Sequence, residues 1–314
     1  MLRVIELFAG IGSQTQALKN IGVPHKVVAI AEIDKYALLS YKTLHGEVFN
    51  LGDITKVEEK DIPDCDLITY SFPCQDISIA GLQGGADEDA NTRSSLLWQV
   101  RKFILAKKPK YLLLENVKNL VSKTHKANFE LWLEFLAAQG YKTKWKVLNS
   151  KNFGVPQNRE RVYAVSILGD DEFEFPEPIT LTTSLADVLD DNPNHNMWLD
   201  KSYSMRTPTS DSGILHIANL DIKGNDSIKR IYDIRGIAPT LTTMKGGNRQ
   251  PKILIGDKVR KLTPRECWRL QGFGPQYELI HGKLSNTQLY AQAGNTISVP
   301  VLEAIFREIF RGEY

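Results

Sequence analysis

The chain has 314 residues and a formal net charge of +2, and 42% of its residues are hydrophobic, as in ordinary globular proteins. No apolar run is long enough to cross a bilayer, which excludes a protein with membrane-spanning helices. The three cysteines are widely separated, and no Cys-x-x-Cys or His-x-x-x-His pair occurs. We therefore expect a cytoplasmic protein without disulfides and without a metal site.

Apolar runs typical of strands alternate with helix-like segments from the N-terminus onward. The sequence predicts strands over 3–8, 26–31, 66–71, 111–114, 144–148 and 161–167, and helices near 13–21, 35–44, 94–106 and 127–139. This alternation is typical of a doubly wound α/β sheet that is parallel at least through its first half.

The pattern changes after residue 167, where prolines interrupt a stretch of weaker periodicity, which predicts a second, smaller domain. Thr263, Pro264 and Glu266 form the start signal of a helix, a capping box with proline at the first position. The amphipathic segment 299–310 predicts a last helix that returns to the first domain.

Charge is unevenly distributed along the second half of the chain. Residues 170–200 contain nine Asp or Glu and no Lys or Arg, whereas residues 223–265 contain eleven Lys or Arg and three Asp. The basic block is either a solvated face or a binding surface for a polyanion such as nucleic acid.

Glycines and acidic residues follow the first predicted strands. Gly10 and Gly12 stand between the first strand and the first helix, where glycine permits a tight turn close to a ligand. Glu32 follows the second strand, in a position suited to the hydroxyl groups of a ribose, and Asp53 lies in a later loop. Together these residues favour an adenosine-containing cofactor over unrelated loop acids.

Candidate catalytic residues follow three later strands. Cys74 comes after the strand at 66–71, and a lone cysteine is either a small core residue or a nucleophile. Glu115 lies at the end of a buried strand, as a candidate acid or a helix cap. Arg159 and Arg161 are two residues apart and would point to the same side of an extended segment, in a surface ion pair or as a clamp for a phosphate or carboxylate.

These motifs resemble, in order and rough spacing, those of the cytosine-C5 DNA methyltransferases. The resemblance lies in Phe8-Ala9-Gly10-x-Gly12, Pro73-Cys74-Gln75, Glu115-Asn116-Val117, Gln157-x-Arg159-x-Arg161, Arg265-Glu266-Cys267-x-Arg269-Leu270-Gln271-Gly272-Phe273 and Gly294-Asn295-Thr296-Ile297-Ser298-Val299. It covers nearly the whole chain and implies a compact enzyme of the bacterial or phage restriction-modification type, with a Rossmann-like methyltransferase sheet. Residues 1–175 with 290–314 would form the catalytic and cofactor-binding domain, and 176–289 the target-recognition domain and hinge.

The resemblance implies a catalytic role for four residues. Cys74 would add to C6 of a cytosine flipped out of a specific duplex sequence, which makes C5 able to accept a methyl group from S-adenosyl-L-methionine. Glu115 would contact or protonate N3 of the base, Arg161 would hold the base carbonyl, and Arg159 would stabilise the loop or a phosphate.

The resemblance also implies cofactor contacts. Phe8 would stack on adenine, Gly10 and Gly12 would lie near the methionine part, and Glu32 would bind the ribose. Asp53 and Ile54 would contact the adenine, and Asn295 would close the pocket. Pro73 and Ile33 complete the expected set, although the family usually has an aromatic residue where this chain has Ile33.

The resemblance implies that the partner is double-stranded DNA. It is weakest in the segment that would recognise the DNA sequence. Arg230 would read a guanine edge, Thr240 would touch the backbone beside the extruded cytosine, and Arg235, Lys245 and Arg249 would bind phosphates. Ser227, or the segment with Gln75 and Ser78, would fill the gap left by the flipped base. We expect a monomer, with a separate cognate restriction endonuclease as a possible partner. The alternatives are a tRNA cytosine-C5 methyltransferase and a catalytically silent DNA-binding protein.

Overall fold

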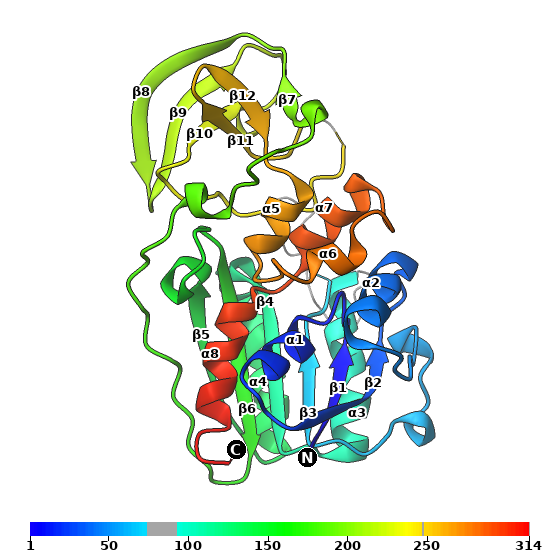
Figure 1. The fold of residues 1–314 in the computed structure, drawn as a ribbon. Coiled ribbons are helices and arrows are strands. Elements are labelled where there is room, and N and C mark those ends of the chain that lie inside the picture. The colour runs from blue at the N-terminus through cyan, green and yellow to red at the C-terminus, as the bar shows by residue number, and fades with distance from the viewer. Residues whose placement is uncertain (74–92, 247, 314) are drawn as a thin grey trace. The chain divides into compact units, whose positions relative to one another are not determined.

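The computed structural model describes residues 1–73, 93–246 and 248–313, and the chain divides into two compact units (Figure 1). The first unit comprises Met1–Leu148, Glu160–Glu177 and Leu302–Tyr314, and the second comprises Asn149–Arg159 and Pro178–Val301. Each unit contains one six-stranded sheet. No helix within the described ranges is long and apolar enough to cross a membrane.

The sheet of the first unit has the strand order β2-β1-β3-β4-β6-β5. Its strands are β1 (Leu2–Leu7), β2 (His25–Ala31), β3 (Leu67–Tyr70), β4 (Tyr111–Val117), β5 (Tyr141–Asn149) and β6 (Glu160–Leu168). The first four run parallel to one another, and β6 is antiparallel to β4. The predicted doubly wound sheet with a parallel first half is therefore confirmed. The chain reverses its direction of winding at β1, so the loops after β1 and β3 leave the same edge of the sheet side by side.

Helices cover both faces of this sheet (Figure 1). They are α1 (Ser13–Asn20), α2 (Lys35–His45), α3 (Val100–Lys107), α4 (Lys126–Ala138) and α8 (Val299–Ile309), and a 3₁₀ helix spans Arg93–Gln99. Phe103 of α3 and Trp132 of α4 pack with Ile68 and Leu112 of the strands in the main core. On the opposite face, Phe310 just past α8 meets the Tyr111 ring edge-on at 5.3 Å, so the last helix belongs to the first unit through most of its length.

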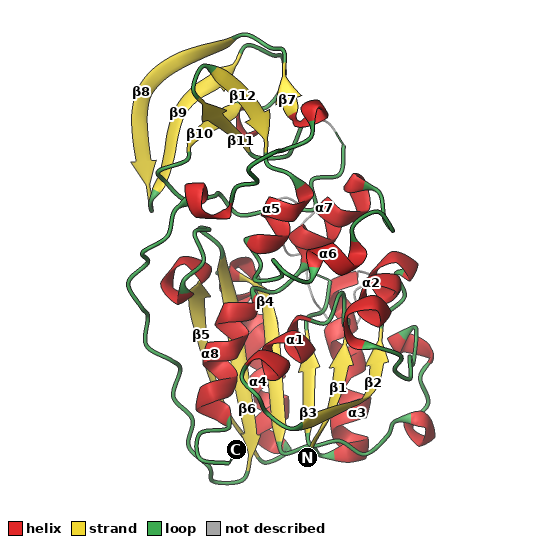
Figure 2. Ribbon diagram, viewed as in Figure 1, coloured by secondary structure: helices red, strands yellow, loops and turns green. Residues whose placement is uncertain are grey.

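The second unit combines a mostly antiparallel sheet with three short helices (Figure 2). Its elements are β7 (Trp198–Leu199), β8 (Tyr203–Asp211), β9 (Ile214–Leu220), β10 (Arg230–Asp233), β11 (Lys252–Ile255), β12 (Lys258–Lys261), α5 (Pro264–Arg269), α6 (Tyr277–Ile280) and α7 (Asn286–Asn295). The strand order is β7-β12-β11-β10-β9-β8, and only β10 and β11 pair in parallel. A small apolar cluster that includes Ala218, Leu220, Ile231 and Val259 fills its core.

A buried ion pair joins the sheet of the second unit to α5. The predicted capping box is present, because the Thr263 hydroxyl accepts from the Glu266 amide (3.1 Å) and the Glu266 carboxylate accepts from the Thr263 amide (2.6 Å). The same carboxylate pairs with Arg260 of β12 at 2.7 Å, and both side chains are almost fully buried. The capping acid therefore also fixes the angle at which α5 leaves the sheet.

Two segments lie in the second unit although the sequence predicted them in the first, namely 149–159 and 290–301. The physical reason is a set of buried side-chain bonds to backbone. Arg159 donates to the carbonyl oxygens of Leu241, Gly294 and Thr296, which ties both segments to the rest of the second unit.

Candidate active site

The carboxyl ends of β3 and β4 bring a carboxylate, a guanidinium group and a hydroxyl together. Glu115 lies in β4 and its side chain is only 7% exposed. Its Oε2 accepts a hydrogen bond from the Ser71 hydroxyl at 2.5 Å, and its Oε1 lies 3.3 Å from Nε of Arg161 at the start of β6. The sheet therefore places Glu115 and Arg161 in direct contact, although they are far apart in the sequence.

The end of β3 is fastened to β4 just before the predicted nucleophile. The buried side chain of Asn116 donates to the carbonyl oxygen of Phe72 at 3.0 Å. Pro73 is the last described residue before Cys74, and Cys74, Gln75 and Ser78 lie outside the described residues. Asn116 was predicted only as part of a motif and Ser71 was not predicted, because neither residue type signals chemistry by itself.

Arg159 does not share the surroundings of Arg161. Its side chain is 2% exposed and donates to the carbonyl oxygens of Leu241 (3.0 Å), Gly294 (3.1 Å) and Thr296 (2.8 Å). Of the two roles expected for it, these bonds match loop stabilisation, since a guanidinium group committed to three carbonyls is poorly placed to clamp a phosphate.

Five of the predicted cofactor residues lie at the carboxyl ends of β1 and β2, namely Phe8, Gly10, Gly12, Glu32 and Ile33. The carboxylate of Glu32 accepts from the backbone N–H of Gly10 through Oε2 (2.8 Å), and from those of Ile33 (2.9 Å) and Asp34 (2.8 Å) through Oε1. These bonds join the glycine loop after β1 to the acidic residue after β2. Because each carboxylate oxygen has two lone pairs, Oε2 can still accept a bond from a ribose hydroxyl.

The glycine loop has a strained backbone. Phe8 has a φ of 58°, which is rare for a bulky side chain and is typical of residues held in place at a functional site. Gly12 has a φ of 80°, and a Cβ atom there would lie 2.5 Å from the His45 ring and 2.8 Å from Tyr41. Only glycine fits this position, as its place in the motif predicts. Strain and shape thus fit a loop that holds a ligand close to its backbone.

The turn predicted to contact adenine is also ordered by local bonds. Asp53 accepts from the Thr55 amide (3.0 Å) and hydroxyl (2.8 Å), which hold the pKa of Asp53 below its ordinary value. Ile54 is buried, whereas Ile33 is 76% exposed and offers an apolar surface beside Glu32. Lys102 of α3 donates to the carbonyl oxygen of Ile54 at 2.5 Å.

Asn50, which was not among the predicted site residues, binds the backbone of both Glu32 and Gly52. Its Oδ1 accepts from the backbone N–H groups of Glu32 (3.1 Å) and Gly52 (3.0 Å), and its Nδ2 donates to the Glu32 carbonyl oxygen (3.0 Å). It therefore connects Glu32, the acid predicted to bind the ribose, to the Asp53 loop. The available signal was an asparagine just before a Leu-Gly-Asp turn, which also fits an ordinary loop.

The predicted DNA-binding side chains of the second unit differ in how far they are engaged. Arg230 pairs with Asp226 at 2.7 Å, and Arg235 pairs with Asp233 at 2.5 Å while its side chain remains 81% exposed. The Thr240 hydroxyl donates to the Asn158 carbonyl oxygen at 2.6 Å.

The other predicted DNA-binding residues of this unit make fewer contacts. Lys245 and Arg249 are exposed and form no ion pair with a described residue. The backbone amide of Ser227 donates to Oδ1 of Asn225 at 3.0 Å. Lys245 and Arg249 thus have the charge and exposure expected of phosphate contacts, whereas Arg230 and Arg235 would have to leave an aspartate first.

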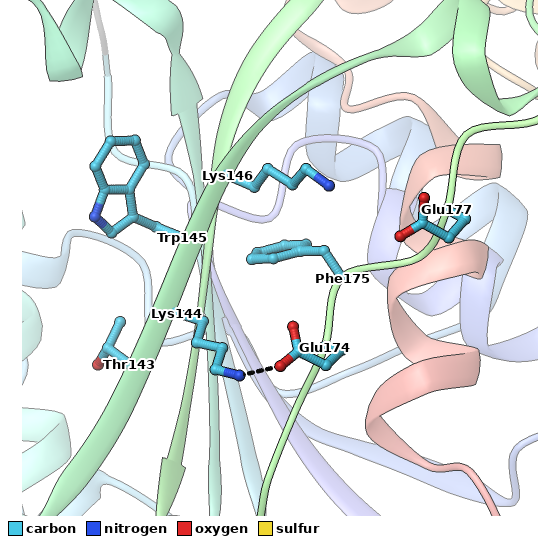
Figure 3. Close-up of a pocket in the computed structure, with 7 residues that line it drawn as sticks. All are labelled: Thr143, Lys144, Trp145, Lys146, Glu174, Phe175 and Glu177. Atoms are coloured by element: carbon cyan, nitrogen blue, oxygen red, sulfur yellow. Dashed lines mark hydrogen bonds and ion pairs between the residues drawn. The ribbon is translucent and has the colours of Figure 1, made fainter.

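A separate hollow of about 660 Å³ lies beside the edge strand β5. Figure 3 shows Lys144 directed at Glu174, with the Phe175 ring between Lys144 and Lys146, and Trp145 on the opposite side of the strand. Its lysines and glutamates balance in charge, and none of the predicted site residues lines it. We assign it no part in the site.

Comparison with known proteins identifies the family to which the chain belongs. The chain matches the C-5 cytosine-specific DNA methylase family over residues 2–311. It is 38% identical to the type II methyltransferase M2.ScrFI of Lactococcus lactis subsp. cremoris, with 100% of both chains covered. It is 36% identical to the type II methyltransferase M.HhaI of Haemophilus parahaemolyticus, with 97% of this chain and 93% of that relative covered.

A solved structure shows the same fold. The S. pombe Dnmt2 methyltransferase superimposes with a TM-score of 0.78 at 21% identity, and 99% of each chain is covered. The family match extends over nearly the whole chain, and the two sequence relatives are matched over 93% or more of their length. The chain therefore belongs to the C-5 cytosine-specific DNA methylase family and is a DNA (cytosine-5-)-methyltransferase that uses S-adenosyl-L-methionine.

Proposed function

We propose that Cys74 is the nucleophile of this methyltransferase and that Glu115 and Arg161 hold the target cytosine. The observation that carries the proposal is the chain of contacts from Ser71 through Glu115 to Arg161 at the carboxyl ends of β3 and β4. Ser71 precedes Cys74 by three residues, and the intervening Phe72 is fastened to β4 by Asn116. The acid and the base-holding cation therefore belong to the same edge of the sheet as the start of the Cys74 segment.

The chemistry assigns a distinct step to each side chain. Attack of the Cys74 thiolate on C6 forms an S–C6 bond and moves the C5=C6 electron pair onto C5, which becomes nucleophilic. Glu115 donates a hydrogen bond or a proton to N3, which withdraws electron density from the ring as the thiolate attacks C6. The bound cofactor would supply an electrophilic methyl group: C5 would form a bond to the methyl carbon while the bond from that carbon to the sulfonium sulfur breaks, and the sulfur would leave as a neutral thioether. Loss of the C5 proton and cleavage of the S–C6 bond then restore the double bond and the thiolate.

Arg161 is suited to the carbonyl oxygen of the base. Its Nε faces Glu115 and its Nη1 donates to the Glu160 carbonyl oxygen at 2.8 Å. Its Nη2 donors form no hydrogen bond with the described residues and are free to reach O2 of cytosine. The ion pair with Glu115 also fixes the guanidinium plane, so the base meets a pre-oriented donor.

The cofactor would be held by the residues at the ends of β1 and β2. The Glu32 carboxylate would accept from the ribose hydroxyls, and Phe8 and Ile33 would present apolar surface to the adenine. Asp53 and Ile54 would contact the adenine edge, and Gly10 and Gly12 would leave room for the methionine part. Pro73 and Asn295 complete the proposed set.

DNA recognition would fall to the second unit and the segment after Cys74. Exposed Lys245 and Arg249 would bind phosphates, together with Arg235 once it releases Asp233. Arg230 would read a guanine edge, Thr240 would touch the backbone beside the extruded cytosine, and Gln75, Ser78 or Ser227 would fill the vacated space. The supporting observations are the excess of basic residues over 223–265 and the exposure of Lys245 and Arg249.

The biological setting is also part of the proposal. We expect a monomer that modifies double-stranded DNA in the cytoplasm and protects it from a separate cognate restriction endonuclease, because the sequence relatives named above are type II methyltransferases. The first unit would carry catalysis and most cofactor contacts, and the second would read the target.

The decisive experiment follows transfer of a labelled methyl group to duplex DNA, with tRNA as the competing substrate. Cys74→Ser is expected to abolish turnover while cofactor binding persists. Cys65→Ala, which removes a buried thiol of the same unit, is the matched control and should retain turnover. Undiminished turnover by Cys74→Ser would refute the nucleophile, and label in tRNA alone would overturn the substrate.

A trapping experiment tests the covalent step directly. Duplex DNA with 5-fluorocytosine at the target has no C5 proton to lose, so the S–C6 bond should persist. The unmodified enzyme is then expected to give a complex that survives denaturing electrophoresis, and Cys74→Ser should give none. Absence of that complex with the active enzyme would contradict the adduct.

A further inference from the structure

Residues 238–242 lie alongside residues 156–159 and pair with them as two short strands do. They precede the basic residues at the end of the recognition segment. Gln157 and Ala238 form a parallel bridge, the Ala238 amide donates to the Pro156 carbonyl oxygen (2.8 Å), and the Asn158 amide donates to the Ala238 carbonyl oxygen (2.8 Å). Thr240 continues the pairing through its hydroxyl bond to Asn158. The backbone around Thr240 is therefore held along one side by this pairing.

Gln157 and Arg159 hold the same segment from within. Both side chains are almost fully buried. Gln157 accepts from the Leu241 amide (3.1 Å) and donates to the Leu270 carbonyl oxygen (2.8 Å). Arg159 donates a hydrogen bond to the Leu241 carbonyl oxygen, so the side chains of Gln157 and Arg159 together bind both backbone polar groups of Leu241.

The other bonds of Arg159 reach the end of α7. Its Nη2 donates to the carbonyl oxygens of Gly294 and Thr296, the residues that flank Asn295. One cation therefore connects the residue after Thr240 with both neighbours of Asn295. Charge-assisted bonds of this kind are shorter and stronger than neutral ones, and they are buried here from competing water.

Gly294 lets the two segments approach more closely than any other residue would allow. A Cβ atom at this position would lie 2.5 Å from the Thr243 amide nitrogen and closer still to the Thr242 carbonyl group. The obstacle is backbone, which cannot rotate away as a side chain can. The segment 240–243 and the end of α7 thus share one packed contact, held by Arg159 and made possible by Gly294.

We propose that Arg159 is a positioning residue that couples cofactor binding to target-DNA binding, by holding Gly294–Thr296 against Leu241. The inference rests on the proposed function, which assigns Thr240 to DNA and Asn295 to the cofactor. When DNA fixes the Thr240 segment, the bonds through Arg159 also fix Asn295 in its binding position. DNA binding thereby strengthens cofactor binding by some factor, and thermodynamic linkage requires the cofactor to strengthen DNA binding by that same factor.

The test measures this coupling factor by titration calorimetry with S-adenosylhomocysteine, which binds without turnover. Its affinity is determined with and without a saturating target duplex, and the affinity for the duplex is determined with and without S-adenosylhomocysteine. For the unmodified enzyme we expect a mutual strengthening of about fivefold or more, as in typical coupled sites. Arg159→Lys, which cannot span three carbonyls, and Gly294→Ala should bring the factor close to one.

Two matched controls separate coupling from general damage. Arg269→Lys alters another arginine that donates to backbone carbonyls, those of Val188 and Leu189. Gly274→Ala adds a Cβ whose nearest neighbour would be an ordinary 3.4 Å contact. Both controls should keep the coupling factor of the unmodified enzyme, and thermal melting establishes that each variant is folded.

The outcomes are distinct. A coupling factor that stays unchanged in Arg159→Lys and Gly294→Ala, even with weaker binding of each ligand alone, would reduce Arg159 to a structural role and overturn the proposal. A factor of one in the unmodified enzyme would also overturn it. Failure of the proposed function itself would show differently, as absent duplex binding or a Cys74→Ser variant with full turnover.

Discussion

Replacing Glu6 with glutamine should change the free energy of unfolding in a way that depends on pH. The value for the variant minus the value for the unmodified protein should be higher at neutral pH than at acidic pH. Glu6 lies in β1 and is fully buried. Its Oε1 accepts from the Thr15 hydroxyl at 2.7 Å, whereas Oε2 has no hydrogen-bond partner among the described residues. Burial raises the pKa of Glu6 from 4.5 to about 7, with bonds from Thr15 and Tyr41 opposing the shift.

The sign follows from proton binding. Between pH 4.5 and about 7 the folded protein keeps a proton on Glu6 that the unfolded chain has lost. Stability is therefore unaffected by Glu6 below the lower pKa and declines as pH rises through the window. Each pKa unit corresponds to about 1.4 kcal/mol, so burial of this carboxylate costs about 3 kcal/mol above the folded-state pKa. Glutamine, which does not titrate, avoids that cost.

The charged neighbours leave this estimate intact. Burial lowers the pKa of His45 to about 4, so its ring is neutral throughout the window. Lys19 is the cation whose charge acts on the pKa of Glu6 and lowers it. Burial lowers the pKa of Lys19 itself, and the Glu6 charge opposes that lowering. Tyr41 stays neutral, because burial raises its pKa.

Urea denaturation at about pH 5 and about pH 8 measures the effect. The free energy of unfolding of Glu6→Gln, relative to the unmodified protein, should rise by up to about 3 kcal/mol from the lower to the higher pH. The control Glu134→Gln changes an exposed glutamate of α4 and should show no such pH dependence. A Glu6→Gln difference that is equal at both pH values would mean that Glu6 is ionised in the folded protein, and would refute the reasoning.

Three further predictions concern the site. Glu115→Gln should lower kcat by about 10²-fold or more with cofactor affinity retained, because an amide cannot transfer a proton to N3; an unchanged kcat in the labelled-methyl assay would exclude Glu115 from the chemistry. Asn50→Ala should weaken cofactor binding about tenfold in calorimetry, because it frees the backbone of Glu32, and equal affinity would contradict the positioning role. Lys245→Ala should reduce the slope of log K against log salt for duplex binding by about one, whereas exposed Lys56→Ala in the first unit should leave it unchanged; an unaltered slope for Lys245→Ala would remove it from the phosphate contacts.

The order of strands and helices in the first unit was readable from the sequence because hydrophobic periodicity follows local geometry. β5 was the strand whose extent was most underestimated, since the sequence predicted 144–148 and the structure has Tyr141–Asn149. It is the edge strand of its sheet, and Lys142, Lys144 and Lys146 alternate along it. Charged side chains are common on edge strands, where they discourage pairing with other chains, and they hide the apolar pattern.

The two arginines of the Gln157-x-Arg159-x-Arg161 motif show what local geometry leaves open. The sequence predicted that both point to one side, which assumes an extended chain across the whole motif. In the structure Arg159 belongs to the second unit and serves three carbonyls, whereas Arg161 belongs to the first and pairs with Glu115. The partners of Arg159 lie 82 to 137 residues away in sequence, so no local pattern indicates them.

By itself the sequence determined the fold class, the family and the position of the first three motifs at the ends of strands, because these depend on short-range patterns. Only the tertiary structure decided which of those ends meet. The order β2-β1-β3-β4 sets Glu32 against Gly10 and Glu115 against Ser71, and packing commits Arg159 to the interior. The physical reason is that strand order and side-chain burial arise from long-range packing, which a linear motif does not record.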